Sequence, residues 1–463
     1  MKEDLTIVIL AAGLGTRMKS QKAKVLHEAG GMTLIEHVVD SALALTAPER
    51  VVVVVGHQAE QVRATVAAKN VRFATQTEQK GTGHAVMVSK DAMPDTHGLL
   101  MVLYGDCPLL SDETLRQLVT VHVESRAAAT VVTTMLNDPT GYGRVVMDAD
   151  GNVAAIVEQK VATEEQRAMR QINSGIYCFD AALFWKHLPA VEPNPVSKEY
   201  YLTDIVEIFH REGLRFKALL HEDANELLGI NTRVELAEVD RVFRHRKAKQ
   251  LMLAGVTIEK PETVTIDSQV TAGQDTVIEA FAQLRGRTIV GSNCRIGAGA
   301  IVRDSHLGNR VEISPYTIIG ASRIDAGATI GPFARLRMDN HIGENAHIGN
   351  FVELKKTHLG KGSKAGHLAY LGDTDIGAGA NIGAGAITCN YDGVHKHKTH
   401  IGDAAFVGSN GTLVAPVRIG DGAYVAAGSV ITHDVPGDAL GVGRSRQVVK
   451  ENWAKKKREA AAK

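Results

Sequence analysis

Residues 324–354 read IDAGATIGPFARLRMDNHIGENAHIGNFVEL, and an apolar residue recurs there at every sixth position. A six-residue period with one inward-pointing apolar side chain is the hexapeptide pattern of a β-helix, in which three short strands form each triangular coil. One coil cannot bury its own core, so the pattern predicts a stack of coils. The apolar positions are Ile324, Ile330, Leu336, Ile342, Ile348 and Leu354.

The same period occurs on both sides of this stretch, in other phases. Between Ile382 and Ile401 it is interrupted by TCNYDGVHKHKTH, residues 388–400. A loop that leaves a regular solenoid is either functional or a tolerated insertion, and the period alone favours neither. The flanking apolar positions are Leu284, Val290, Ile296 and Val302, and then Ile401, Val407, Leu413, Ile419, Val425 and Ile431.

The first half of the chain alternates short apolar runs with stretches of helical spacing, such as residues 33–45. This alternation predicts a doubly wound α/β domain with a largely parallel sheet and ligands at the carboxyl ends of its strands. A charged segment with apolar residues at helical spacing, residues 235–249, predicts a connecting helix. The expected strands are LTIVILAA (5–12), VVVVV (51–55), LLMVLYGD (99–106) and ATVVTTML (129–136).

Composition excludes several classes of protein. The 463 residues carry 52 basic and 52 acidic side chains, so nothing indicates a nucleic-acid partner. We find no apolar run long enough for a membrane span and no basic flank typical of a signal peptide. The four cysteines are scattered without a CxxC pair, which favours a reducing compartment and a cytoplasmic protein.

The first expected strand runs into LAAGLGTRMKSQKAK, residues 10–24. Gly13 and Gly15 allow a phosphate to approach the backbone closely, and Arg17 and Lys24 add positive charge. The segment completes neither GxGxxG nor the GK[ST] of a P-loop, so by itself it is also compatible with a plain strand-to-helix turn.

Further fragments give this segment a context. LAAGLGTRM (10–18) followed by KVLH (24–27) resembles the signature of sugar-nucleotide pyrophosphorylases. With the fragments below, nearly the whole chain resembles the bifunctional N-acetylglucosamine-1-phosphate uridyltransferase/glucosamine-1-phosphate N-acetyltransferases. The fragments are QTEQKGTGHA (76–85), LYGDCPLL (103–110), GYGRV (141–145), IVEQK (156–160), INSGIY (172–177), GIN (229–231), FVELKKTHLGKGSKAGHLAYLGD (351–373) and NIGAGAITCNYDG (381–393).

The resemblance implies a Rossmann-like nucleotidyltransferase domain at residues 1–233, a linker helix at 234–254, and a left-handed parallel β-helix with a C-terminal tail at 255–463. In the first domain it implies that Arg17 and Lys24 neutralise phosphates and that Asp106 and Asn231 hold Mg2+, for which oxygen ligands are suited. The implied contacts to the UDP-sugar are Leu10, Ala11, Ala12, Gly13, Lys24, Gln76, Gly81, Thr82, Tyr104, Gly105, Asp106, Gly141, Glu158, Asn173 and Asn231.

In the β-helix the resemblance implies that His367 is the general base of acetyl transfer, a role that suits neutral imidazole near pH 7. The implied sugar-phosphate ligands are Arg337, Lys355, Tyr370 and Asn381. The implied acetyl-CoA contacts are Ala384, Asn390, Tyr391, Ser409, Ala427 and Arg444.

The implied enzyme acetylates glucosamine 1-phosphate with acetyl-CoA, then transfers UMP from UTP to N-acetylglucosamine 1-phosphate and releases pyrophosphate. Its product would supply peptidoglycan and lipopolysaccharide precursors, and the family implies a homotrimer. The chain departs from the family at Ala23, at Val161, in RLRMDN (335–340) and in GVGRSR (441–446). Two alternatives are a single-activity pyrophosphorylase with a regulatory or oligomerising β-helix, and a non-catalytic assembly subunit.

Overall fold

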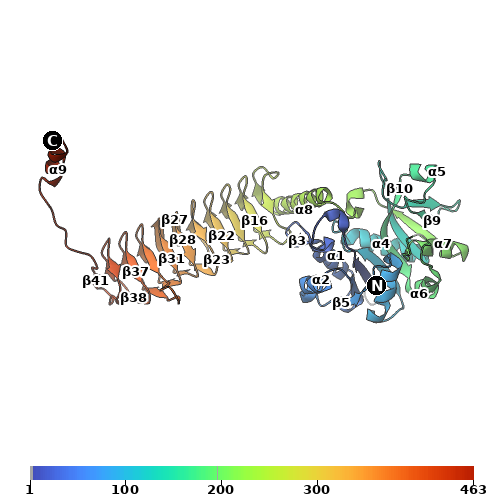
Figure 1. The fold of residues 1–463 in the computed structure, drawn as a ribbon, viewed down its shortest axis with the longest axis horizontal. Coiled ribbons are helices and arrows are strands. Elements are labelled where there is room, and N and C mark those ends of the chain that lie inside the picture. Colours follow the sequence, from blue (N-terminus) through green and yellow to red (C-terminus); the bar gives the residue numbers. More distant parts are fainter. Residues whose placement is uncertain (1–3, 196, 463) are drawn as a thin grey trace. The chain divides into compact units, whose positions relative to one another are not determined.

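The computed structural model describes residues 4–195 and 197–462. The chain divides into two compact units, Met1–Phe243 and Arg244–Lys463 (Figure 1). The division falls inside the long helix α8 (Arg233–Leu253), which includes the segment expected to form a connecting helix.

The first unit contains a mixed sheet in the order β11-β7-β10-β6-β1-β4-β5. The strands β6, β1, β4 and β5 are mutually parallel, as the apolar runs predict, and β11 is parallel to β7. The long strand β10 is antiparallel to both β6 and β7, so the sheet is less uniformly parallel than expected. The bounds are β1 (Leu5–Ala11), β4 (Val51–Val55), β5 (Arg72–Thr75), β6 (Leu99–Tyr104), β7 (Ala129–Met135), β10 (Gln171–Asp180) and β11 (Phe216–Leu220), with β8 (Arg144–Met147) and β9 (Val153–Val157) as a hairpin beside β10.

Helices cover both faces of this sheet, because alternate side chains of each buried strand point to opposite sides. On β1, Ile7 and Ile9 pack in one apolar cluster, and Val8 and Leu10 pack in another. The first cluster includes residues of α1 (Leu34–Leu43), α2 (Ala59–Val66) and α4 (Asp112–Ser125); the second includes residues of α3 (Thr82–Ser89), α6 (Ala181–His187) and α7 (Asp204–Arg211). This is the doubly wound arrangement that the sequence predicts.

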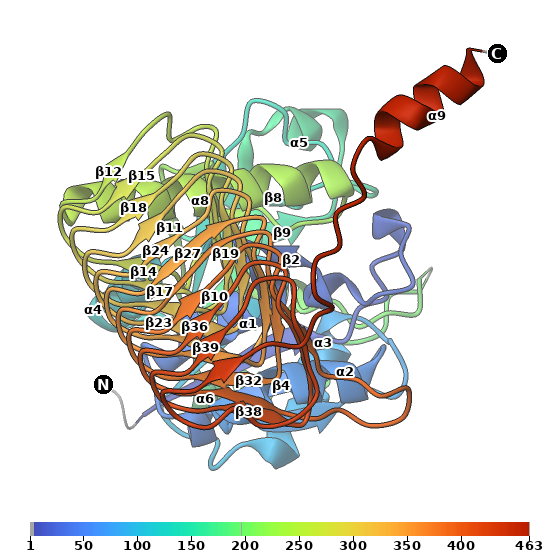
Figure 2. The ribbon, with the colours of Figure 1, turned by 90° about the vertical axis from the view of Figure 1, so that its left-hand side faces the viewer.

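The second unit is a parallel β-helix, as the six-residue period predicts. Its short strands, from β12 (Thr257–Ile258) to β41 (Leu440–Gly441), form three parallel sheets in which each strand pairs with the third one along the chain, except that β39 (Tyr424–Val425) pairs with β41 at the end of the stack. We call these sheets face 1 (β12 to β41), face 2, from β13 (Thr265–Ile266) to β40 (Val430–Ile431), and face 3, from β14 (Thr271–Ala272) to β38 (Val417–Ile419). Figure 2 views the coils along their stack. Every apolar repeat position named above lies in one buried cluster.

The helix α8 is an ordered element with apolar contacts. In the first unit, the ring of Phe243 stacks on His37 with 3.9 Å between ring centroids. In the second unit, Leu251 joins the β-helix core and Arg244 pairs with Asp267 at 2.6 Å. The basic tail forms α9 (Trp453–Ala461), and its side chains are exposed.

Candidate active sites

A cavity of about 570 Å³ opens in the first unit, where the parallel strands β1 and β6 end. The carboxyl ends of parallel strands are the usual place for a ligand in such folds. Most of the residues expected to contact a UDP-sugar line this cavity. They are Leu10, Ala11, Ala12, Gly13, Lys24, Gln76, Gly81, Thr82, Tyr104, Asp106 and Asn231, together with Arg17.

Four polar side chains converge in this cavity from distant parts of the chain. The ammonium of Lys24 contacts the carboxylate of Asp106 and lies 3.2 Å from Oδ1 of Asn231. Nη2 of Arg17 donates to the same Asn231 oxygen at 2.7 Å. The side chains of Lys24 and Asp106 are 16% and 13% exposed, so their charges interact in a partly desolvated place.

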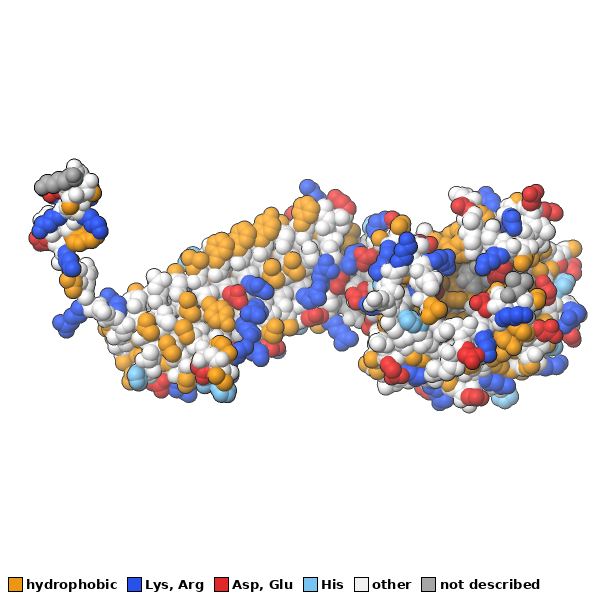
Figure 3. Space-filling view, viewed as in Figure 1, with side chains coloured by type: hydrophobic (Ala, Val, Ile, Leu, Met, Phe, Trp, Pro, Cys, Tyr) orange, Lys and Arg blue, Asp and Glu red, His pale blue; other side chains and the backbone are white. Residues whose placement is uncertain are grey.

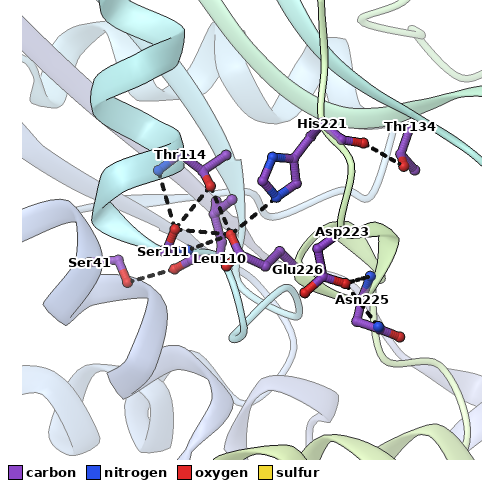
Figure 4. A network of polar contacts seen from close by, with 9 residues as sticks. All are labelled: Ser41, Leu110, Ser111, Thr114, Thr134, His221, Asp223, Asn225 and Glu226. Atoms are coloured by element: carbon purple, nitrogen blue, oxygen red, sulfur yellow. Dashed lines mark hydrogen bonds and ion pairs between the residues drawn. The ribbon is translucent and has the colours of Figure 1, made fainter. Parts of the chain in front are cut away.

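The segments that carry Asp106 and Asn231 are tied together. The backbone N–H of Ile230 donates to the carbonyl of Asp106 at 2.9 Å. A second set of contacts joins the same two segments (Figure 4). The carboxylate of Glu226 accepts hydrogen bonds from the hydroxyls of Ser111 and Thr114 at 2.9 and 2.8 Å, and Nε2 of His221 lies 3.5 Å from Oε2 of Glu226. This network fixes the start of α4 against the 3-10 helix η7 (Ala224–Leu227), and so holds the two oxygen donors in register.

Replacing Glu226 by alanine is expected to lower the free energy of unfolding of the first unit by about 1–3 kcal/mol, because Ser111 and Thr114 lose the acceptor of their hydroxyls. Urea denaturation followed by fluorescence measures the change. Glu222→Ala, which removes an exposed carboxylate nearby, is the matched control. Equal free energies of unfolding for the two variants would show that the hydrogen bonds of Glu226 do not stabilise the first unit.

The residues expected to bind the sugar in the first unit are Glu158, Asn173 and Gly141. The side chains of Glu158 and Asn173 both come close to Gly143: a Cβ there would be 3.5 Å from Glu158 Oε1 and 3.7 Å from Asn173 Cβ. Burial raises the pKa of Glu158. Gly141 is exposed on the loop before β8, and Gly105 donates its N–H to the carbonyl of Leu10 at 3.0 Å.

Five further residues line the cavity that the sequence interpretation did not include, namely Val25, Ala85, Gln79, Glu199 and Tyr201. The loop with the last two docks on the start of α3, where Gly83 donates to the carbonyl of Tyr200 at 2.8 Å. A Cβ at Gly81 would lie 2.5 Å from that same carbonyl oxygen. The two glycines around Thr82 therefore indicate that another backbone segment packs closely here. They do not indicate which segment it is.

In the second unit, the expected acetyl-transfer residues occupy two places. One is the corner between faces 1 and 2, where left-handed residues such as Leu368 (φ 48°) and Asn410 (φ 55°) turn the chain. His367 immediately precedes such a residue. Backbone bonds link successive coils along this corner, as from Asn410 N–H to the Ala384 carbonyl at 2.7 Å. The expected residues on this corner are His367, Ala384, Ser409 and Ala427, and Arg444 lies 3.9 Å from the Cβ position of Gly428.

The other place is the carboxyl end of two strands of face 2, β28 (Glu353–Lys355) and β31 (Tyr370–Gly372). A Cβ at Gly372 would lie 2.5 Å from the hydroxyl of Tyr370 and 2.8 Å from Nδ2 of Asn390, so both groups gather over this glycine. Gly372 pairs in register with Lys355 on the adjacent coil. Arg337 follows β25 (Arg335–Leu336) on the preceding coil and lies 3.3 Å from Glu353.

One cation here was missed by the sequence interpretation. Lys396, in the loop that interrupts the six-residue period, lies close to Lys355, and this neighbouring lysine, more than the charge of Arg337, lowers the pKa of Lys355. Three cations close together favour an anionic ligand. This clustering supports the functional interpretation of the loop. Tyr391 lies exposed in the same loop, whereas Asn381 begins β33 (Asn381–Ile382) on face 1.

The first cavity is suited to a hard cation. Asp106 and Asn231 each present an oxygen to one cationic atom, Nζ of Lys24. Carboxylate and amide oxygens are suitable ligands for magnesium, which commonly takes its other ligands from phosphates and water. In residues 4–195 and 197–462, no group of three or more His, Cys, Asp or Glu side chains is arranged to hold a metal.

Known protein families match both units. Residues 7–170 match the MobA-like NTP transferase domain, residues 273–304 the bacterial transferase hexapeptide, and residues 398–433 the hexapeptide repeat of succinyl-transferase. The bifunctional protein GlmU of Solibacter usitatus is 59% identical over 100% of this chain and 99% of its own length. The chain belongs to the GlmU family.

Two other GlmU proteins agree, each over nearly all of both chains. The protein of Koribacter versatilis is 49% identical over 98% of this chain and 97% of its own, and that of Alkaliphilus metalliredigens is 47% identical over 98% of each. The chain is therefore a bifunctional transferase, with a nucleotidyltransferase unit and a left-handed β-helix acyltransferase unit. GlmU membership implies nucleotide, sugar-phosphate and acyl-CoA substrates and a divalent metal cofactor. Among the described residues, no helix is both long and apolar enough to cross a bilayer.

Proposed function

We propose that the β-helix acetylates glucosamine 1-phosphate with acetyl-CoA, and that the first unit then transfers UMP from UTP to the acetylated sugar phosphate and releases pyrophosphate. The observation that carries this proposal is the convergence of Lys24, Asp106 and Asn231 in the first cavity, from positions up to 207 residues apart. The group of Arg337, Lys355 and Lys396 in the second unit supports the acetyl-transfer half.

In the first cavity, the phosphate oxygen of N-acetylglucosamine 1-phosphate attacks the α-phosphorus of UTP in line with the departing pyrophosphate. Positioning and charge neutralisation supply most of the rate in such reactions. Arg17 and Lys24 neutralise the phosphates, while Gln76 and the backbone of residues 10–13 hold the uridine. Asp106 and Asn231 hold Mg2+, which when bound neutralises phosphate charge.

Glu158, Asn173 and Gly141 bind the acetylated sugar beside this cavity. The raised pKa of Glu158 reflects its burial, and a sugar hydroxyl is a suitable partner for such a carboxyl group. The aromatic ring of Tyr104 lies against Gly175 and also lines the cavity.

In the β-helix, the amine of glucosamine 1-phosphate attacks the thioester carbon of acetyl-CoA. His367 accepts the amine proton, and the sugar phosphate lies on Arg337, Lys355 and Lys396. Tyr370 and Asn381 contact the sugar. Acetyl-CoA follows the corner between faces 1 and 2, where it meets Ala384, Ser409, Ala427 and Arg444, with Asn390 and Tyr391 beside it.

The same proposal covers assembly and location. Exposed aromatic rings stack along the β-helix corner, with 5.4 Å between the centroids of Tyr316 and Phe333 and 5.6 Å between those of Phe333 and Phe351. Figure 3 shows rows of hydrophobic side chains on the surface of this unit. Such a surface supports association of identical chains, and we propose a homotrimer. The four free cysteines suit the cytoplasm, where the product would supply peptidoglycan and lipopolysaccharide precursors.

Omitting one reagent at a time tests the proposal. Purified protein is mixed with glucosamine 1-phosphate, acetyl-CoA, UTP and magnesium, and free thiol and pyrophosphate are measured. We expect thiol release without UTP, and pyrophosphate release from preformed N-acetylglucosamine 1-phosphate without acetyl-CoA. Pyrophosphate without any thiol would instead support a single-activity pyrophosphorylase whose β-helix serves regulation or assembly.

A further inference from the structure

Two strands of face 1 are longer than their neighbours. The strands β27 (His347–Asn350) and β30 (Lys364–His367) have four residues each, whereas the other strands of face 1 in the described chain have two. Both end in glycine followed by a polar residue, in the sequences HIGN and KAGH. In the sheet register, Asn350 lies directly beside His367.

Gly349 allows this extension. A Cβ at Gly349 would lie 1.8 Å from the carbonyl oxygen of Gly366, so only glycine permits the two backbones to approach this closely. The strands therefore stay paired up to the corner between faces 1 and 2. Their last side chains, Asn350 and His367, emerge next to each other at that corner.

A hydrogen bond of 2.8 Å joins Oδ1 of Asn350 to Nδ1 of His367. An amide oxygen can only accept, so Nδ1 carries the proton and the neutral ring has its free lone pair on Nε2. Among the described residues, this is the one hydrogen bond that the Asn350 side chain makes. Its backbone carbonyl separately accepts the N–H of Leu368 at 3.1 Å, a contact that any replacement of the side chain would keep.

We propose that Asn350 is a positioning residue for acetyl transfer: it fixes the tautomer and the orientation in which His367 presents Nε2 to the attacking amine. The inference rests on the proposed acetyl transfer. In that step the C–N bond forms, the amine proton passes to Nε2, the C–S bond breaks and the leaving thiolate takes the proton from the imidazolium. In the other tautomer Nε2 carries a hydrogen and cannot accept the proton.

Two isosteric variants test this role. Asn350→Leu removes the acceptor, and Asn350→Asp keeps an acceptor oxygen in the same place. At about pH 8.5, where an ordinary imidazole is neutral, we expect the leucine variant to lose about 10-fold to 100-fold in kcat for thiol release, a part of the 10²-fold to 10⁴-fold that a general base contributes. KM for both substrates should stay the same. The aspartate variant should keep kcat within about threefold of the wild type.

A double-mutant cycle separates positioning from a structural role. If Asn350 acts through His367, then Asn350→Leu should change kcat by less than about twofold in a His367→Ala background. A structural role would cost the same in both backgrounds. Thermal unfolding of each variant, followed by circular dichroism, verifies that the β-helix is intact.

The inference is overturned if the leucine variant keeps its kcat, if the aspartate variant loses as much as the leucine variant, or if the loss persists without His367. Failure of the proposed function has different signatures. In that case the wild type would release no thiol from acetyl-CoA, or His367→Ala would match the wild type.

Discussion

Asp106→Ala is expected to reduce uridylyl transfer by at least about 10³-fold, which corresponds to about 4 kcal/mol of transition-state stabilisation. The carboxylate is one of two oxygen donors that converge on Nζ of Lys24, and under the proposed function it would help to hold the Mg2+ that neutralises phosphate charge. The partly buried ammonium of Lys24 also loses its counter-charge. Acetyl transfer should be unchanged, because its residues lie in the other compact unit.

Pyrophosphate release from UTP and N-acetylglucosamine 1-phosphate measures the first activity, and thiol release from acetyl-CoA measures the second. Asp106→Asn keeps the side-chain volume and distinguishes loss of charge from loss of packing. Asp112→Ala, an exposed carboxylate at the start of α4, is the matched control and should retain full activity. Equal loss of both activities in a folded Asp106→Ala variant would refute the assignment.

His367→Ala is expected to reduce acetyl transfer by about 10²-fold to 10⁴-fold, the usual contribution of a general base. The attacking amine must lose a proton, and the hydrogen bond that Nδ1 of His367 donates to Oδ1 of Asn350 leaves Nε2 of this ring free to accept it. Uridylyl transfer should continue at the wild-type rate. KM for glucosamine 1-phosphate should change little, since Arg337 and Lys355 remain to bind its phosphate.

Thiol release as a function of both substrates gives kcat and KM for this variant. His306→Ala removes an exposed histidine on face 3 of the same β-helix and is the matched control. A His367→Ala variant with wild-type kcat would exclude His367 as the base, whatever its KM.

The sequence predicted the β-helix closely because each coil repeats one steric requirement. The six-residue period predicts that Ile330, Ile342 and Ile348 point into the interior of the β-helix, and all three are almost fully buried. The buried strands of the first unit were equally visible as apolar runs. The antiparallel direction of β10 could not be predicted from the sequence, because it depends on the connections between strands and not on the composition of any one strand.

The site residues from local motifs were easier to find than those brought in by tertiary contacts. Lys24 and Asp106 follow expected strands or glycine-rich turns, and the structure brings them into contact. Glu199 and Tyr201 enter the same cavity on a loop with no motif of its own. Asn350 became evident only once the coil register placed it beside His367, and Lys396 only once the folded loop brought it near Lys355.

Mixing two damaged enzymes tests most directly whether one chain houses two independent chemistries. From glucosamine 1-phosphate, acetyl-CoA, UTP and magnesium, Asp106→Ala should stop at the acetylated sugar phosphate, and His367→Ala should make almost no product. A mixture of the two purified variants should form UDP-N-acetylglucosamine, because each supplies the step that the other lacks. A mixture that stays inactive, or either variant making the product alone at the wild-type rate, would contradict the account.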